Sequence, residues 1–286
     1  MNNTMKTPVA IPVSKLHPFE GHPYKVLDNE KMNTLIESIQ TQGILSPLIV
    51  RPMENTTDEY EVVSGHRRLH AAVKAGLETI PAFIYALDRD AAAIAVVDSN
   101  LHREHILPSE KAFAYKMKLD AMKHQGKTSC QVGTKSRTDE QMAENSDDSA
   151  RQIQRYIRLT NLIPELLAMM DEGKIALSVG VELSFLPEQF QYDVLEICDM
   201  NDGTPSYSQS WHLHQFYKDG VLDKYLIFKT LSEEKANQRE IIKVPVERLK
   251  NIVPESYTVK QTEDFLIKAA EYYHRNIIRQ HNRDSR

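Results

Sequence analysis

The chain has 286 residues, of which 41% are hydrophobic and 26% charged, ordinary values for a globular protein of about two or three compact units. This composition excludes a wholly disordered, collagen-like or disulfide-stapled protein, and the cysteines, Cys130 and Cys198, form no Cys-x-x-Cys pair. No apolar stretch approaches the ~18 residues that span a bilayer, and residues 1–10 lack a signal-peptide hydrophobic region. We therefore expect a soluble cytoplasmic protein with no membrane contact.

The first hundred residues alternate between strand and helix patterns. Asp28 is placed to cap a helix that ends at Gly43, and a second helix is expected from Arg67 to Ala75. Strands are expected between and around these helices, at residues 9–13, 48–50, 60–63 and 80–85. The pattern predicts a small mixed α/β domain over residues 1–106.

From residue 89 onward the hydrophobic period is almost entirely helical. It predicts an all-α domain over residues 107–204 and a mostly helical region over 205–286, with a polar break between them, so the fold class is α+β. A long helix is expected to begin at Pro108 and to end at Gly126, followed by an exposed polar loop.

Charge is unevenly distributed along the chain. The whole chain carries 35 basic and 40 acidic residues, a net charge of −5, whereas residues 111–137 hold seven lysines and arginines against Asp120 alone, a net +6. A basic stretch is most often a solvated helix face. It therefore indicates nucleic-acid binding only if a neighbouring element can read bases.

Residues 62–70 read as a strand, a glycine turn and the start of a helix. Gly65 lets the backbone approach an anion, and the free N–H groups at the helix start point toward it. Arg67 and Arg68 can bind the anion's oxygens. A glycine before a helix is usually only a turn, so this pattern alone is a weak indication of phosphate binding.

A second polar segment lies at residues 97–105. Asn100, Arg103 and Glu104 are spaced at i, i+3 and i+4 and so share one face of a helix. One interpretation is a local ion pair with a capping asparagine. The other is a triphosphate and Mg²⁺ site, completed against the glycine turn, with Asn100 or Glu104 near the metal.

Residues 138–159 read as two short helices joined by a polar turn. Thr138 can cap the first helix and Ser149 the second, whose Ile153 faces inward. The side chains that face outward suit guanine and adenine edges; they are Arg151, Gln152, Gln154 and Arg155. A generic two-helix corner is the alternative. The outward row directly after the +6 segment favours a helix-turn-helix that binds DNA, with further contacts from Thr138 and from the basic residues Lys127, Lys135 and Arg137.

The last segment predicts an amphipathic helix. Thr258 to Gln261 is a capping-box pattern, and an apolar face follows at Phe265, Leu266, Ala269, Tyr273 and Ile277. We expect this helix to take part in dimerisation.

The ordered segments resemble the ParB/RepB family of partition proteins, including its nucleoid-occlusion and KorB-type relatives. The similarity covers residues 8–200 and rests on Ile11–Phe19, Ser38–Arg51, Gly65–Ala71 and Asn100–Glu110, followed by the helix-turn-helix. It implies a nucleoid-associated homodimer that binds a short double-stranded DNA site, that acts in plasmid, mobile-element or chromosome partition, and that partners a ParA-type ATPase. It also implies that the N-terminal domain binds CTP with Mg²⁺ and closes the dimer into a clamp on DNA. The nucleotide-binding residues that it assigns are Ser64, Gly65, His66, Arg67, Arg68, Asn100, Arg103 and Glu104.

Two positions depart from the family pattern. His66 stands where the arginine box usually has glutamate, and Ser99 stands where the asparagine box usually begins with glutamate. Both departures remove a carboxylate from the region of the metal. Phosphate recognition needs cations and donors, so we expect CTP binding to survive, whereas weak CTP hydrolysis stays open.

Three other functions share features with this pattern. A transcriptional repressor would use the same helix-turn-helix. Sulfiredoxin shares the N-terminal fold, but its thiol chemistry is not expected because Cys130 lies far from the glycine turn. A metal-dependent nuclease is not expected either, because no acidic cluster is apparent near His66 or His70.

Overall fold

The computed structural model describes residues 7–54, 56–103, 105–128, 138–144, 146–233, 244, 248–249, 252–254 and 256–284. The chain divides into two compact units, Met1–Glu233 and Glu234–Arg286. No helix within these described ranges is long and apolar enough to cross a membrane. The fold class is α+β, as predicted, with an N-terminal sheet followed by helices.

The first unit begins with a five-stranded mixed sheet in the order β1-β5-β3-β4-β2. Strand β3 pairs parallel to β5 and antiparallel to β4, while β1 is antiparallel to β5 and β2 is parallel to β4. The strands are β1 (Val9–Pro12), β2 (Leu16–Pro18), β3 (Leu48–Pro52), β4 (Tyr60–Ser64) and β5 (Thr79–Ile84). The sequence pattern predicts all of them except β2, which is too short to show alternation.

Alternation along β4 places its neighbouring valines on opposite faces of the sheet. Val62 packs with Leu69 and Ala72 of α2 (His66–Ala75), whereas Val63 packs with Ala92 of α3 (Arg89–Leu101). The sheet is therefore covered by α2 on one face and by α3 on the other. Helix α1 (Glu30–Gln42) packs against α2.

The prediction that Asp28 caps the first helix is wrong. Asn29 is the N-cap of α1, and its side chain accepts a hydrogen bond from the Met32 N–H (3.1 Å). Asp28, one residue further out, instead pairs with His70 (2.8 Å) and Lys74 (2.6 Å) of α2. Both residues suit a cap, so only the neighbouring basic side chains separate their roles.

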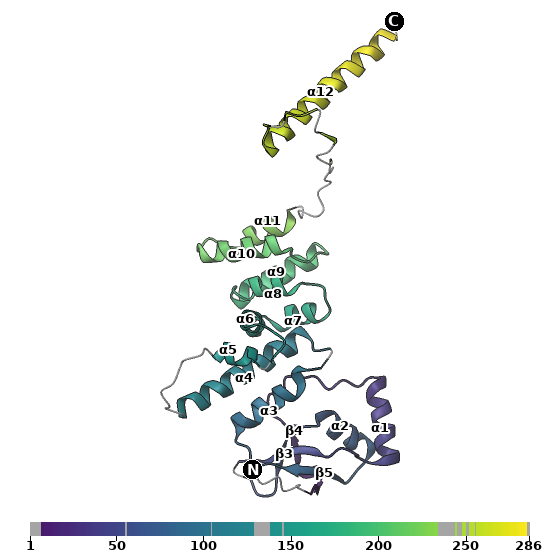
Figure 1. The fold of residues 1–286 in the computed structure, drawn as a ribbon, viewed down its shortest axis with the longest axis vertical. Helices are drawn as coiled ribbons and strands as arrows, with labels where there is room; N and C mark the ends of the chain where they lie inside the picture. Colours follow the sequence, from purple (N-terminus) through teal and green to yellow (C-terminus); the bar gives the residue numbers. More distant parts are fainter. Residues whose placement is uncertain are drawn as a thin grey trace. The chain divides into compact units, whose positions relative to one another are not determined.

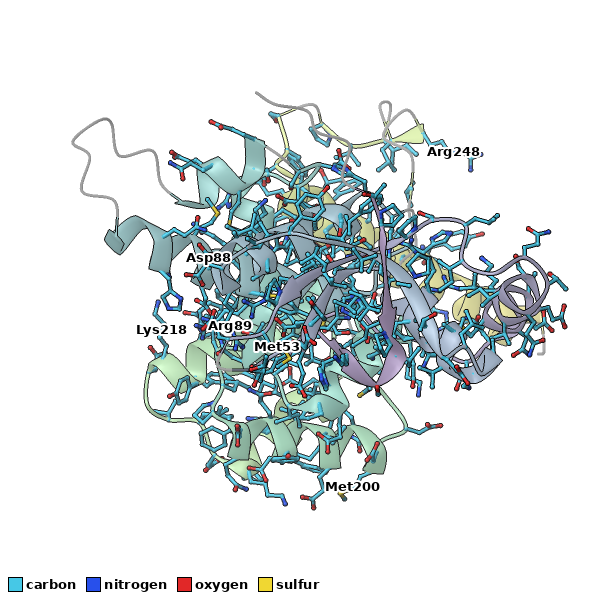
Figure 2. The ribbon with its side chains drawn as sticks, turned by 90° about the horizontal axis from the view of Figure 1, so that it is seen from below. Met53, Asp88, Arg89, Met200, Lys218 and Arg248 are labelled. Carbon is cyan, nitrogen blue, oxygen red and sulfur yellow. The ribbon has the colours of Figure 1, made fainter. Side chains whose placement is uncertain are left out.

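The rest of the first unit is helical, and Figure 1 shows α3 and α4 between the sheet and the remaining helices. Asp88 caps α3 by accepting from the Ala91 N–H (2.7 Å), and Figure 2 marks it beside Arg89. The helices after α3 are α4 (Pro108–Thr128), α5 (Thr138–Glu144), α6 (Ala150–Arg158), α7 (Pro164–Asp171), α8 (Leu177–Leu183), α9 (Glu188–Met200), α10 (Tyr207–Lys218) and α11 (Lys224–Ser232).

Two boundaries differ from those expected. Helix α4 continues through Gly126 to Thr128, because a single glycine costs a helix only about 1 kcal/mol relative to alanine. Helices α10 and α11 also share one core with α7 to α9, to which Leu213 and Ile227 contribute. The helical body therefore runs through Ser232 and does not divide near residue 205.

The second unit is described mainly by one helix, α12 (Val259–Asp284). The predicted capping box is confirmed, since the Thr258 N–H donates to Gln261 Oε1 (2.8 Å) and the Gln261 N–H donates to Thr258 Oγ1 (3.4 Å). Large apolar and aromatic side chains of this helix are exposed, among them Tyr272 (70%) and Tyr273 (68%).

Candidate functional site

The glycine turn between β4 and α2 requires glycine. Gly65 has φ 110° and ψ 22°, in the left-handed region, and a Cβ there would lie 2.9 Å from Leu48 Cγ. In the part of the chain that the structure describes, no side chain caps α2, and its first turn holds no acidic residue. The leading N–H groups of α2 are therefore open to an anion.

The two arginines of the turn have different surroundings. The Arg68 guanidinium donates from Nη1 to the carbonyl oxygens of Ser46 and Pro47 (2.9 Å to Pro47), and burial lowers its pKa. It therefore holds the segment before β3 against α2. Arg67 is half-buried, and its side chain makes no hydrogen bond or ion pair with any described residue. Arg67 is therefore the cation of this turn that is free to meet a ligand.

His66 is a neutral group in the folded protein. Burial, the neighbouring His22 and Arg103 lower its pKa to about 3. Its Nε2 accepts from the Phe19 N–H (3.3 Å), which leaves the ring proton on Nδ1. The His22 ring lies 3.7 Å away between centroids and donates from Nδ1 to the Tyr24 carbonyl (2.9 Å). Burial lowers the pKa of His22 as well.

Arg103 brings the second polar segment to the turn. Its guanidinium carbon lies 5.5 Å from the Tyr24 ring centroid, and its positive charge helps to lower the pKa of both His22 and His66. The segments around residues 65 and 100, separate in sequence, are thus joined through His22 and Tyr24. The sequence pattern does not point to His22 or Tyr24, because their only local signal is a turn containing Gly21 and Pro23.

Asn100 is buried in the last turn of α3, which ends at Leu101, so Arg103 lies beyond the helix and the predicted helix face shared by Asn100 and Arg103 is wrong. Its Nδ2 donates to the carbonyl of Val96 (2.6 Å) and to Ser99 Oγ (3.2 Å), so Oδ1 is the atom that can face a cation. Glu104 lies outside the described residues, and those residues contain no group of three or more His, Cys, Asp or Glu side chains placed to hold a metal ion. A Mg²⁺ ion that accompanies a nucleotide takes most of its ligands from phosphates and water, so one protein oxygen suffices.

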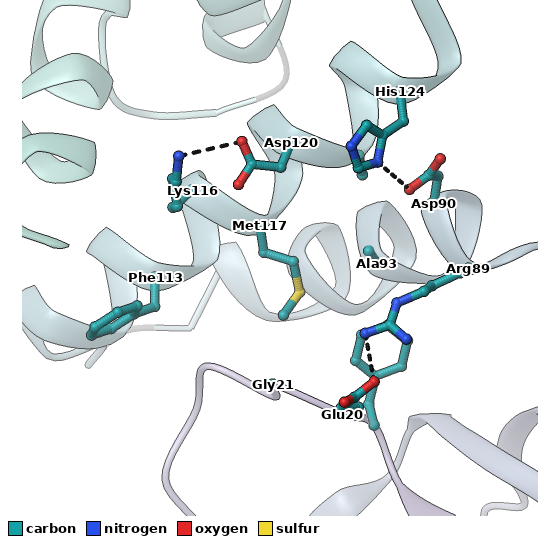
Figure 3. A pocket seen from close by; sticks show the side chains of 12 residues that line it. Glu20, Gly21, Arg89, Asp90, Ala93, Phe113, Lys116, Met117, Asp120 and His124 are labelled. Atoms are coloured by element: carbon teal, nitrogen blue, oxygen red, sulfur yellow. Dashed lines mark hydrogen bonds and ion pairs between the residues drawn. The ribbon is translucent and has the colours of Figure 1, made fainter. Parts of the chain in front are cut away.

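A pocket of about 330 Å³ adjoins the same loop (Figure 3). Met117 and Ala93 form part of its apolar lining. Charged side chains line the rim and pair with each other, as Glu20–Arg89 (2.7 Å), Asp90–His124 (3.3 Å) and Lys116–Asp120 (3.4 Å). Because these charges are already paired, the pocket suits a phosphate less well than the Gly65 turn does.

The predicted helix-turn-helix is present as α5, a turn and α6. Ser149 Oγ accepts from the Gln152 N–H (3.3 Å), which confirms this cap, and Met142 and Ile153 are fully buried between the two helices and α4. The outward row is as predicted: Arg151 and Gln154 are exposed, and Gln152 and Arg155 are partly exposed. Of the other predicted DNA contacts, Lys135 and Arg137 lie outside the described residues, and the side chains of Lys127 and Thr138 are not described.

Helix α4 holds the turn between α5 and α6. The Tyr115 hydroxyl donates to Asp148 Oδ2 (2.7 Å), and Lys111 Nζ lies 2.8 Å from the same oxygen. Burial raises the pKa of Tyr115 above its usual range, so the phenol stays protonated and keeps donating. The start of α6 is therefore fixed against a helix that also packs on α3, which covers one face of the sheet.

Sequence comparisons agree on one family. The family model for the ParB N-terminal domain matches residues 2–101. The chain is 33% identical over 193 residues to the chromosome-partitioning protein Spo0J of Thermus thermophilus, covering 67% of this chain and 65% of that protein. It is 40% identical over 111 residues to the nucleoid occlusion protein of Listeria innocua, covering 38% of each. The chain therefore spans less than two thirds of these relatives' lengths.

Among solved structures, the similar ones include truncated ParB from Caulobacter crescentus in two complexes. The complex with the parS site has a TM-score of 0.43 at 22% identity and covers 72% of this chain and 98% of that chain. The complex with CTP-γ-S has a TM-score of 0.32 at 25% identity and covers 66% and 98%.

The neutral state of His66 predicts a loss of stability in acid. The folded ring resists protonation down to about pH 3, whereas the unfolded chain takes up the proton near the ordinary pKa of 6.5, so the free energy of unfolding should fall as pH drops below that value. In His66→Gln, the amide oxygen can still accept a hydrogen bond from the Phe19 N–H. For this variant we expect the free energy of unfolding to fall less steeply with decreasing pH, by up to ~1 kcal/mol per pH unit. Urea unfolding at a series of pH values would measure both slopes, and equal slopes would contradict this account.

Proposed function

Because the chain belongs to the ParB family, with a ParB N-terminal domain over residues 2–101, we propose that it is a sequence-specific DNA-binding protein that acts in partition or nucleoid occlusion. One observation carries most of the proposal. Arg151, Gln152 and their outward neighbours project from a helix whose start is capped by Ser149 and held by α4. These are the side chains and the helix end that read base edges in the major groove.

We propose further that the Gly65 turn binds the phosphates of CTP, the nucleotide that the family resemblance implies. The open N–H groups of α2, Arg67 and Arg103 would supply donors and positive charge, while Arg68 keeps the turn in place. Asn100, with Glu104, would offer oxygens to Mg²⁺, whose charge balances that of the phosphates.

The site supports binding of CTP more than its hydrolysis. A neutral His66, whose Nε2 is occupied by the Phe19 N–H, cannot replace the negative charge of the glutamate usual at this position. Slow or absent turnover would leave a nucleotide-bound clamp to persist on DNA.

We propose that the protein is a homodimer through α12. Its apolar side chains are too exposed for a 26-residue helix that remains single in water, and a second copy offers a matching face. A ParA-type ATPase partner and a place on the nucleoid follow from the same family membership as further proposals.

The DNA proposal predicts that substitutions of two basic residues weaken DNA binding in different ways. Arg151→Ala should cost about tenfold in affinity for a duplex selected from a randomised library and little on a scrambled duplex, because base contacts carry discrimination. Lys127→Ala should weaken both duplexes alike, as a phosphate contact does. Fluorescence anisotropy at one salt concentration would compare them. Equal losses on both duplexes for Arg151→Ala would show that α6 does not read bases.

The nucleotide proposal predicts that Arg67→Ala weakens CTP binding by tenfold or more, roughly the effect of losing a charged phosphate ligand. Arg89→Ala, which removes the same charge from a residue already paired with Glu20, should bind CTP like the unaltered protein. Isothermal calorimetry with and without DNA would measure both. No CTP binding by the unaltered protein in either condition would remove the nucleotide proposal and leave the DNA proposal standing.

The dimer proposal predicts that charge on the apolar face of α12 separates the protomers. Leu266→Glu with Tyr273→Glu should give a monomer in sedimentation equilibrium, because burying two carboxylates without partners is unfavourable. Lys268→Glu, at an exposed polar position on the same helix, should leave the dimer intact. A dimer that survives the double change would place the interface elsewhere.

A further inference from the structure

Arg158, the last residue of α6, does not join the outward row of the helix. Its guanidinium carbon lies 4.0 Å from the ring centroid of Phe185, just after α8, and its Nη2 donates to the Ser184 carbonyl (3.2 Å). Its Nε is buried without a hydrogen-bond partner among the described residues. The positive charge is thus held mainly by an aromatic face and one carbonyl rather than by a carboxylate.

The other face of Phe185 is occupied by a residue of α10. The rings of Phe185 and His214 are stacked, with centroids 4.1 Å apart and planes 7° from parallel. Because the guanidinium and the imidazole both approach the same ring centroid within about 4 Å, they must lie on opposite faces of it. Phe185 therefore sits between the end of the DNA-reading helix and α10.

The stack ends in a hydrogen bond back to α8. His214 Nδ1 lies 2.7 Å from Glu182 Oε2, and the two side chains are only 16% and 15% exposed. We name the four residues Arg158, Phe185, His214 and Glu182 the aromatic column. It joins α6, α8 and α10 through a cation–π contact, a ring stack and a hydrogen bond.

We propose that the aromatic column sets the orientation of α6 for base reading. Arg158 acts as a positioning residue, and α10 supports Phe185 through His214. This inference rests on the proposed DNA-binding function. The first residues of α6 are fixed by the turn that Tyr115 and Asp148 hold, and the column fixes its last residue. A helix restrained at both ends presents Arg151 and Gln152 at one angle, which discrimination between bases requires.

The proposal gives the segment around α10 a part in DNA specificity. This segment lies beyond the ParB N-terminal domain match at residues 2–101, and α10 contributes no outward residue to the DNA-reading row. Its contribution would be indirect, through His214 and Phe185.

Substitutions of Phe185 test the column, because this side chain is 37% exposed and its replacement leaves the buried core intact. Phe185→Leu removes the aromatic ring, whereas Phe185→Tyr keeps it. Arg158→Lys keeps the charge but loses the flat guanidinium. Trp211→Leu removes an exposed aromatic side chain elsewhere on α10 and is the matched control.

The readout is the ratio of dissociation constants for a scrambled duplex and for the duplex that the unaltered protein selects from a randomised library. Phe185→Leu and Arg158→Lys should lower this ratio about tenfold, the worth of one base contact, while scrambled-duplex binding stays unchanged. Phe185→Tyr and Trp211→Leu should keep the original ratio. Thermal unfolding would confirm that every variant is folded at the assay temperature.

Two results would overturn the proposal in distinguishable ways. If Phe185→Leu keeps the original ratio, or weakens both duplexes equally, the aromatic column stabilises the fold without setting specificity. If the unaltered protein enriches no sequence from the library, the proposed DNA-reading function fails, and this inference fails with it.

Discussion

Two buried carboxylates at the start of α4 are the constraint on which the first unit depends. Asp171 of α7 accepts from the Ser109 N–H (3.0 Å) and hydroxyl (2.6 Å), and it pairs with Lys25 Nζ (3.1 Å). Glu110 accepts from the N–H groups of Lys25 (2.8 Å) and Leu107 (3.1 Å). These bonds satisfy N–H groups at a helix start and place negative charge at the positive end of the dipole. They also tie α4 to the loop that carries His22 and Tyr24.

From that junction α4 reaches both candidate sites. Along its length it packs on α3 through Ala121, and it holds the turn before α6 through Tyr115 and Lys111. The glycine turn and α6, the helix proposed to read DNA, are therefore both attached to α4. Lys25, which follows Tyr24 in this loop, is hydrogen-bonded directly to Glu110 of α4 and to Asp171 of α7.

The charge state of the glycine turn follows from burial rather than from residue type. In water, histidine can carry a positive charge below pH 6.5, and two histidines beside two arginines would then repel each other. The His22 and His66 rings lie tilted against each other, with centroids 3.7 Å apart, and burial lowers the pKa of both, so Arg67 and Arg103 remain the charged groups at this position. The departure of His66 from the family pattern is thus accommodated without a buried cation.

The sequence alone determined the features that depend on residues close together along the chain. The hydrophobic period located α1, α2 and α4, Gly65 located the glycine turn, and Ser149 located the cap of α6, because helix periodicity, left-handed glycine and capping act within a few residues. The outward row of α6 followed from the same period. What only the tertiary structure decided depends on contacts between distant segments: Asn29 rather than Asp28 as the cap, the short strand β2, the place of His22 and Tyr24 beside His66, and the union of α10 and α11 with the helical body. Burial and pairing between distant residues set the energy of these features, and neither quantity can be read from local spacing.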